Sequence, residues 1–135
     1  MFISPQAEQE AKKEKIKRKD YWLAPGIVVK VMSKQLAGGK YYKQKGVVLK
    51  VIENYVGEVE LNESGDIVRL DQQFLETVIP NVGGKVRIVN GAYRDEEAVL
   101  ESVDIDNFKA SVRILKGYFN DRVVDVPYED FSKLA

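Results

Sequence analysis

The chain has 135 residues, a formal net charge of zero, and neither histidine nor cysteine. The sequence therefore lacks the usual zinc ligands, thiol nucleophiles and disulfides, and the side chain that most often acts as a general base near neutral pH. It has no run of 18 apolar residues and opens with no signal-peptide pattern, so we expect no membrane association. This length fits one domain or two small ones.

The zero net charge conceals an uneven distribution. Residues 1–45 contain 11 Lys and Arg against 4 Asp and Glu, whereas residues 46–135 contain 10 against 17. A leading segment with excess positive charge, followed by an acidic body, indicates an anionic partner met by one face or tail. A solvated helix or a localisation signal explains the basic residues at 12–19 equally well.

In chain order, residues 1–20 contain helix formers with almost no apolar stripe, and we predict a basic linker or frayed helix there. From Trp22 onward the sequence changes to short β-branched runs separated by turn signals. We predict a strand over 26–33, a basic loop over 36–45 and three strands over 46–70. A tight helical turn and a short closing strand follow over 71–80.

The second half repeats this order. Residues 83–91 parallel 25–33, residues 96–115 parallel 45–61, and residues 121–135 parallel 66–79. A period of about 55 residues with five short strands per copy predicts an all-β fold of two small barrels, over 21–80 and 81–135. The copies differ mainly in the first loop, which is long and basic at 33–45 and short at 90–97.

Catalysis is not expected from this composition. Asp95, Glu96 and Glu97 are adjacent in a predicted loop, where like charges more often solvate than catalyse, and their spacing matches no calcium loop. The sequence contains no glycine-rich phosphate-binding motif. A Ser/Lys or paired-carboxylate mechanism stays formally open, but the pattern favours a non-catalytic binding module without metal or cofactor.

Basic and aromatic residues are interleaved in the first loop of each copy. Loop tyrosines can stack on unpaired bases while nearby Lys and Arg contact phosphates. Alternatively, Tyr42 and Tyr93 cap the barrel cores, and the lysines are exposed because lysines usually are. For either loop alone this alternative is stronger, whereas two such loops and a basic tail favour nucleic acid. The loop residues are Lys40, Tyr41, Tyr42, Lys43 and Lys45 in the first copy, and Lys85, Arg87, Tyr93 and Arg94 in the second.

Four segments carry a resemblance to a known family: "KDYWLAPGIVVKV", "LDQQFLETVIP", "NGAYRDEEAVLES" and the terminal "YEDFSKLA". They resemble the C-terminal region of the eukaryotic Kin family of DNA/RNA-binding proteins, the antigenic determinant of RecA protein homologues, over residues 12–135. The resemblance implies two tandem five-stranded SH3-like barrels, the second with a KOW motif. It also implies that this chain is a C-terminal fragment without the family's zinc finger.

The resemblance further implies RNA binding, with single-stranded or curved DNA as a second class of ligand, in a nuclear protein of DNA replication, DNA damage response and mRNA processing. One anion-contacting lysine is implied per barrel, and the matching positions are Lys45 and Lys133. We expect these two to contact phosphates in a monomer, with nuclear proteins as further partners. Supporting contacts are expected from Lys40, Lys43, Arg87 and Arg94, and a stacking face from Tyr41 or Tyr93.

The KOW-like segment departs from the usual motif at its tip. Asp95 and Ala98 stand where glycines are expected, and residues 95–97 are all acidic, which repels phosphate near Arg94. A protein-binding use of this loop is therefore the alternative. That use would be recognition of a peptide or of methyl-lysine, and a methyl-lysine cage would need converging aromatic side chains. Candidates for these are Trp22, Tyr41, Tyr42 and Tyr55.

Overall fold

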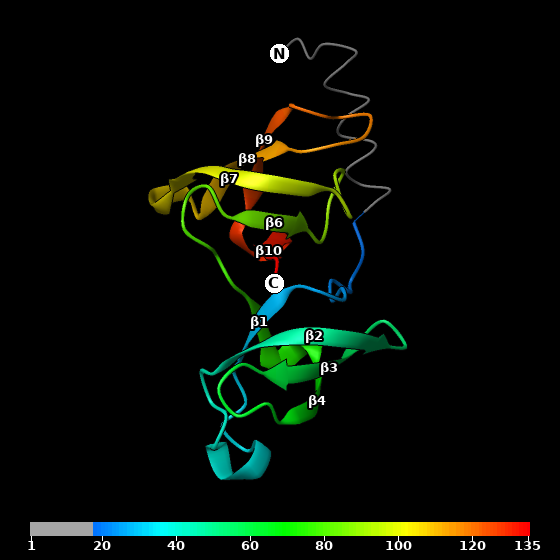
Figure 1. The fold of residues 1–135 in the computed structure, drawn as a ribbon, viewed down its shortest axis with the longest axis vertical. Coiled ribbons are helices and arrows are strands. Elements are labelled where there is room, and N and C mark those ends of the chain that lie inside the picture. Colours follow the sequence, from blue (N-terminus) through cyan, green and yellow to red (C-terminus); the bar gives the residue numbers. More distant parts are fainter. Residues whose placement is uncertain (1–17) are drawn as a thin grey trace.

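The computed structural model describes residues 18–135. Most of the predicted basic linker or helix at 1–20 therefore lies outside the described residues. Residues 18–135 form two five-stranded antiparallel sheets in the strand orders β4-β3-β2-β1-β5 and β10-β6-β7-β8-β9 (Figure 1). No helix in this described part of the chain is long and apolar enough to cross a membrane.

Each sheet bends into a small barrel, and we call them barrel 1 and barrel 2. Barrel 1 contains β1 (Val28–Val31), β2 (Lys45–Ile52), β3 (Val56–Leu61), β4 (Ile67–Asp71) and β5 (Leu75–Thr77), with short 3-10 turns η1 (Leu36–Gly39) and η2 (Gln72–Phe74). Barrel 2 contains β6 (Lys85–Ile88), β7 (Glu97–Asp104), β8 (Lys109–Ile114), β9 (Val123–Pro127) and β10 (Phe131–Lys133), with η3 (Ile105–Asn107) and η4 (Tyr128–Asp130).

The internal repeat predicted from the sequence is confirmed strand by strand. Val29 lies opposite Thr77 in barrel 1, and Val86 lies opposite Lys133 in barrel 2. Both barrels also contain a β-bulge at the same point of the long second strand, between Val48 and Lys50 and between Leu100 and Ser102. A bulge bends the strand and increases its twist, so both sheets can curl in the same way.

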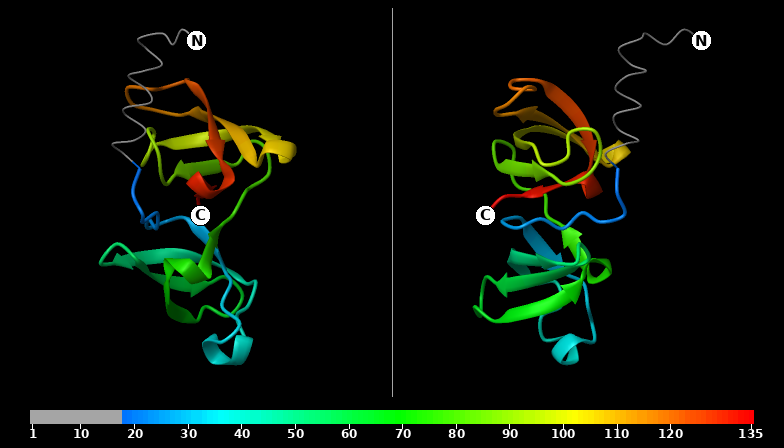
Figure 2. Two further views of the ribbon diagram at one scale, coloured as in Figure 1. Left: turned by 180° about the vertical axis from the view of Figure 1, so that it is seen from behind. Right: turned by 90° about the vertical axis from the view of Figure 1, so that its right-hand side faces the viewer.

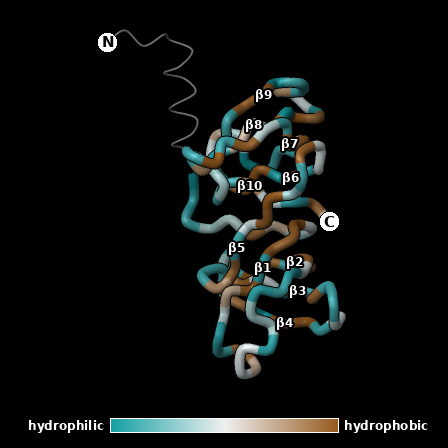
Figure 3. The backbone as a smooth tube through the Cα atoms, turned by 90° about the vertical axis from the view of Figure 1, so that its left-hand side faces the viewer, coloured by the Kyte–Doolittle hydropathy of each residue, from teal (hydrophilic) through white to brown (hydrophobic). Residues whose placement is uncertain are grey.

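Alternating apolar residues fill the two barrels. In β3 and β8 every second side chain is buried, as the period of a strand requires. Figure 3 shows the hydrophobic segments gathered along the strands of both barrels. The fully buried Phe131 packs in the core of barrel 2, whereas Val89 and Leu134, which follow strands of barrel 2, pack against the core of barrel 1. The two cores are therefore connected by side chains that cross the junction.

Backbone contacts also join the barrels, which are in contact at β1, β5 and β10 (Figure 2). Leu134 forms a β-bridge with Ile27. The N–H of Lys133 donates to the carbonyl of Val78 over 2.8 Å, and the N–H of Ala135 donates to the carbonyl of Gly26 over 3.0 Å. The C-terminal end of barrel 2 is thus bonded to the residues that flank the first and last strands of barrel 1.

The residues that enter barrel 1, which we call the entry segment (18–24), contact both barrels. The side-chain amide of Asn90 bonds the backbone of Lys19 in both directions, at 3.0 and 2.9 Å. The N–H of Trp22 donates to the side chain of Gln72 over 3.2 Å. Residues 18 and 19, assigned to the linker by sequence, therefore bond barrel 2, whereas Asp20 bonds Tyr55 and Gln72 of barrel 1.

Candidate nucleic-acid interface

The loop between β1 and β2 and the loop between β6 and β7 end in the same backbone turn. The N–H of Lys43 donates to the carbonyl of Val31 over 2.7 Å, and the N–H of Asp95 donates to the carbonyl of Ile88 over 2.8 Å. Both residues are left-handed, with φ of 66° for Lys43 and 75° for Asp95. Residues 41–45 therefore correspond one by one to residues 93–97.

The correspondence shows that the two loops have opposite charge at equivalent positions. Lys43 corresponds to Asp95, and Lys45 corresponds to Glu97. The shared backbone presents two exposed lysines in barrel 1, whereas barrel 2 has the exposed Asp95 and the half-buried Glu97, which pairs with Arg87 and Lys116. An anionic ligand is therefore attracted to the loop of barrel 1 and repelled by its counterpart.

The basic loop, which we define as residues 33–45, contains four exposed lysines, and two of them lie beside the ring of Tyr42. The amino groups of Lys34 and Lys43 lie 5.3 Å and 5.5 Å from the ring centroid of Tyr42. Lys40 and Lys45 are exposed in the same loop. Phosphates can bind such ammonium groups while an unpaired base stacks near the half-buried Tyr42 ring.

Tyr41 has a different role from its neighbour. Its side chain is only 8% exposed and belongs to the core of barrel 1. Its hydroxyl donates to the Asp66 carboxylate over 2.5 Å, which fixes the basic loop to the turn between β3 and β4. This burial does not favour the stacking role expected for Tyr41, because a base needs an accessible ring face. Tyr42 is the tyrosine of this pair that reaches the surface.

The bond between Tyr41 and Asp66 makes stability depend on pH. The hydrogen bond from Tyr41 holds the pKa of Asp66 below its ordinary value of 3.8. A carboxyl with a lowered folded-state pKa contributes stability above its unfolded pKa, and this contribution is lost as the pH falls through the folded pKa. We expect Tyr41→Phe to lower the free energy of unfolding more at about pH 7 than at about pH 3, as measured by urea titration. A difference that stays constant over this range would contradict the assignment.

The arginines expected to bind anions in barrel 2 are engaged within the protein. Arg87 pairs with Glu97 at 3.0 Å and donates to the carbonyl of Asp95 over 2.9 Å. Arg94 donates to the carbonyl of Tyr21 over 2.7 Å, and its guanidinium lies 4.8 Å from the centroid of the Tyr21 ring. Both arginines hold loops in place, and Arg94 attaches the entry segment to barrel 2.

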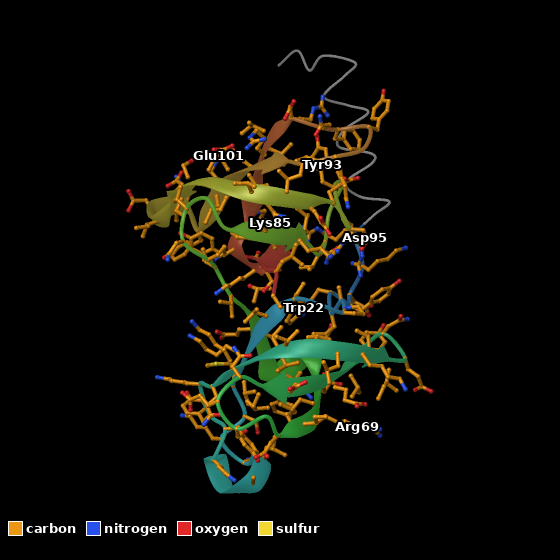
Figure 4. The ribbon with its side chains drawn as sticks, in the orientation of Figure 1. Trp22, Arg69, Lys85, Tyr93, Asp95 and Glu101 are labelled. Atoms are coloured by element: carbon orange, nitrogen blue, oxygen red, sulfur yellow. The ribbon has the colours of Figure 1, made fainter. Side chains whose placement is uncertain are left out.

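Tyr93, the other expected stacking residue, is half-buried beside the core of barrel 2. Its ring meets Phe119 edge to face with centroids 5.1 Å apart, and its hydroxyl accepts from Arg122 over 3.0 Å. Figure 4 places Tyr93 near Asp95 in the upper barrel, at a distance from the basic loop. Among residues 18–135, no three acidic side chains are grouped so that they could hold a metal ion.

Lys45 and Lys133 are both exposed but lie in different places. Lys133 ends β10 beside the junction, where the next residue pairs with Ile27. Lys45 begins β2 opposite Lys30, further along β1 from the junction and next to the rest of the basic loop. A cleft lies between the barrels, and neither Lys45 nor Lys133 lines it. Lys45 instead lines a shallow hollow with Tyr42, Lys43 and Glu63.

Sequence reasoning omitted Lys34 and did not choose Tyr42 as the stacking residue. Lys34 returns to the Tyr42 ring because Ser33 turns the chain: its hydroxyl accepts from the N–H groups of Gln35 and Leu36 at 3.3 and 3.1 Å. A serine whose hydroxyl can bond the backbone N–H groups that follow it is a turn signal visible in the sequence. Which of Tyr41 and Tyr42 points inward depends on the left-handed turn at Lys43, which the sequence does not reveal.

Comparison with known proteins agrees with this architecture. Residues 18–71 match the "KN17 SH3-like domain" family, and residues 80–135 match the "KIN17 C-terminal SH3 domain" family. The molecule is therefore a tandem of SH3-like domains. The chain belongs to the KIN17 family, as its resemblance predicted.

Curated relatives extend the match to most of the chain. It is 57% identical to "KIN17-like protein" of Arabidopsis thaliana, and 48% and 45% identical to "DNA/RNA-binding protein KIN17" of Mus musculus and Homo sapiens. Each alignment covers 95% of this chain but only 31%, 33% and 33% of the respective relative. The chain thus spans about a third of the length of these relatives.

Proposed function

We propose that this pair of barrels is a non-catalytic RNA-binding module of a nuclear protein, with the basic loop of barrel 1 as its main contact. The observation that carries the proposal is the charge reversal between two loops of the same backbone, with Lys43 and Lys45 facing solvent where barrel 2 has Asp95 and Glu97. The mouse and human relatives are named DNA/RNA-binding proteins, which supports the ligand class.

The mechanism proposed is electrostatic attraction with limited stacking. Lys34, Lys40, Lys43 and Lys45 supply cations, Tyr42 supplies a ring among them, and Lys133 adds a cation near the junction. These contacts carry no base code, so we expect affinity for unpaired RNA and for single-stranded DNA without strong sequence preference. The roles proposed for the longer protein are DNA replication, the DNA damage response and mRNA processing.

The dependence of binding on salt tests the mechanism. Oligouridine binding, followed by fluorescence anisotropy at several salt concentrations, should give a slope of log K against log salt of about −3, if four phosphates each contribute about −0.7. Amide chemical-shift mapping of the same titration should locate the contact at residues 33–45. A slope near zero, or shifts confined to barrel 2, would contradict the proposal.

A protein-binding function remains the second candidate, and one observation favours it for barrel 2. The tip of the loop between β6 and β7 is acidic and lies beside the aromatic residues Tyr93 and Phe119, which does not suit a phosphate backbone. The aromatic residues proposed by sequence for a methyl-lysine cage do not form one group, because Tyr41 is in the core of barrel 1 while Tyr55 bonds Asp20 and meets Tyr21 edge to face.

A further inference from the structure

The cleft between the barrels has a volume of about 500 Å³ and is distinct from the basic loop. Its walls come from β5 of barrel 1 and from η4 of barrel 2, and the entry segment closes it with Trp22. Figure 4 places Trp22 at the level where the two barrels meet. The side-chain hydroxyl of Thr77 donates to the carbonyl of Tyr128 over 2.9 Å, and this bond fixes the two walls relative to each other.

The lining of this cleft is acidic and aromatic. Three carboxylates line it, from Glu76, Glu129 and Asp130, whereas Arg18 is the one cationic side chain among the described lining residues. Trp22 and Tyr128 add aromatic surface. Phosphates are repelled by this excess of negative charge, whereas a cation on an apolar stem fits both the carboxylates and the rings.

The protein itself shows which cation the cleft accepts. The guanidinium of Arg18 forms an ion pair with Asp130, and both of its terminal nitrogens face the two carboxylate oxygens. The Asp130 side chain is only 4% exposed and that of Arg18 is 45% exposed, and both residues line the cleft. A planar guanidinium matches a carboxylate in this two-pronged way, which a lysine ammonium cannot do. Glu76 and Glu129 are exposed on the two walls.

We infer that the cleft binds an arginine side chain of a protein partner. The aliphatic stem of that arginine packs on Trp22 and Tyr128, and its guanidinium pairs with Glu76 and Glu129. Arginine is preferred over lysine because a guanidinium both stacks on rings and bonds carboxylates through two nitrogens. The inference does not depend on RNA binding, since none of the lysines of the basic loop lines the cleft.

The single tryptophan of the chain makes the inference directly testable. Its indole N–H gives one resonance in a ¹⁵N-labelled sample, and Trp22 lines the cleft. The probes are three blocked peptides that differ at two positions, Gly-Gly-Arg-Gly-Arg-Gly-Gly and its versions with lysine or with uncharged citrulline. We expect saturable shifts of the Trp22 indole with the arginine peptide, and at least about tenfold weaker binding of the citrulline peptide.

Matched variants separate the cleft from general surface charge. Glu76→Gln with Glu129→Gln should weaken binding of the arginine peptide by about tenfold, because both carboxylate partners are lost. Glu53→Gln with Glu60→Gln removes the same charge from exposed sites outside the cleft and should leave the affinity unchanged. All four side chains are exposed, so neither variant should disturb folding.

Three results would overturn the inference. Equal affinity for the arginine and citrulline peptides would show that charge is not recognised. Shifts confined to residues outside the cleft would place the peptide elsewhere. A saturable change in the chemical shift of the Trp22 indole on addition of oligouridine would assign the cleft to nucleic acid. RNA binding that leaves this chemical shift unchanged supports two separate sites. If the protein does not bind oligouridine but binds the arginine peptide at the cleft, the proposed RNA-binding function fails and the present inference stands. The two proposals can therefore fail independently.

Discussion

Replacement of Lys43 by Asp together with Lys45 by Glu should reduce oligouridine affinity by at least about tenfold, because each lost phosphate contact removes a released counterion and each new carboxylate repels phosphate. The variant gives barrel 1 the residues that barrel 2 has at these positions. Since Asp95 adopts the same left-handed turn as Lys43, the substitution should leave the backbone unchanged. Fluorescence anisotropy measures the affinity, and circular dichroism verifies the fold.

The matched control moves the same change of charge to barrel 2. Lys109→Glu with Lys116→Glu also replaces two exposed or half-exposed lysines by acids, and it breaks their ion pairs of 3.6 Å with Asp125 and Glu97. Such pairs contribute little to stability. If this control lowers RNA affinity as much as the basic-loop variant does, the effect is one of net charge, and the basic loop is not the site.

Lys133→Glu provides a further arm of the same experiment. Lys133 lies at the junction and apart from the basic loop, so its replacement should have a smaller effect than the pair at positions 43 and 45. A larger effect of Lys133→Glu would move the main contact to the junction. Comparison of the two arms thus ranks the surfaces of the module.

The strands of both barrels could be predicted because their signal is local. Alternating apolar residues mark β3 and β8, and turn residues separate the strands. The repeat added a second, independent constraint, since a strand found in one copy predicts its counterpart in the other. The fold class therefore followed from local strand patterns together with the repeat of about 55 residues.

The candidate site was less predictable because its chemistry depends on where each charged side chain points. The sequence shows that Arg94 is basic but cannot show that its guanidinium turns back to the carbonyl of Tyr21. The same holds for Arg87, which is paired with Glu97. Exposed lysines such as Lys43 could be found from composition, whereas arginines with partners far along the chain required coordinates.

The junction between the barrels was also outside the reach of sequence patterns. Ser132 is fully buried, and its hydroxyl forms two hydrogen bonds to the backbone of barrel 1. It accepts from the N–H of Val78 over 2.9 Å and donates to the carbonyl of Val28 over 2.6 Å. In the sequence this serine simply precedes Lys133, and nothing in the neighbouring residues distinguishes it from an exposed serine.

Ser132→Ala removes a single hydroxyl group, but we expect it to destabilise the folded protein strongly. It leaves a buried N–H on Val78 and a buried carbonyl on Val28 without their partner, and each such loss costs about 1–3 kcal/mol. We expect the free energy of unfolding to fall by about 2–4 kcal/mol, as measured by urea titration. The fluorescence of Trp22 reports on the junction in the same titration, and circular dichroism reports on both sheets.

Ser102→Ala is the matched control, since Ser102 is exposed at the bulge of β7 and its change should stay within about 0.5 kcal/mol. In the wild type the two probes should give one shared transition, because β10 is bonded to both barrels. In Ser132→Ala the Trp22 transition should move to lower urea than the loss of the sheets, as the junction opens before the barrels unfold. If Ser132→Ala behaves like Ser102→Ala in both probes, the side-chain bonds of Ser132 do not couple the barrels.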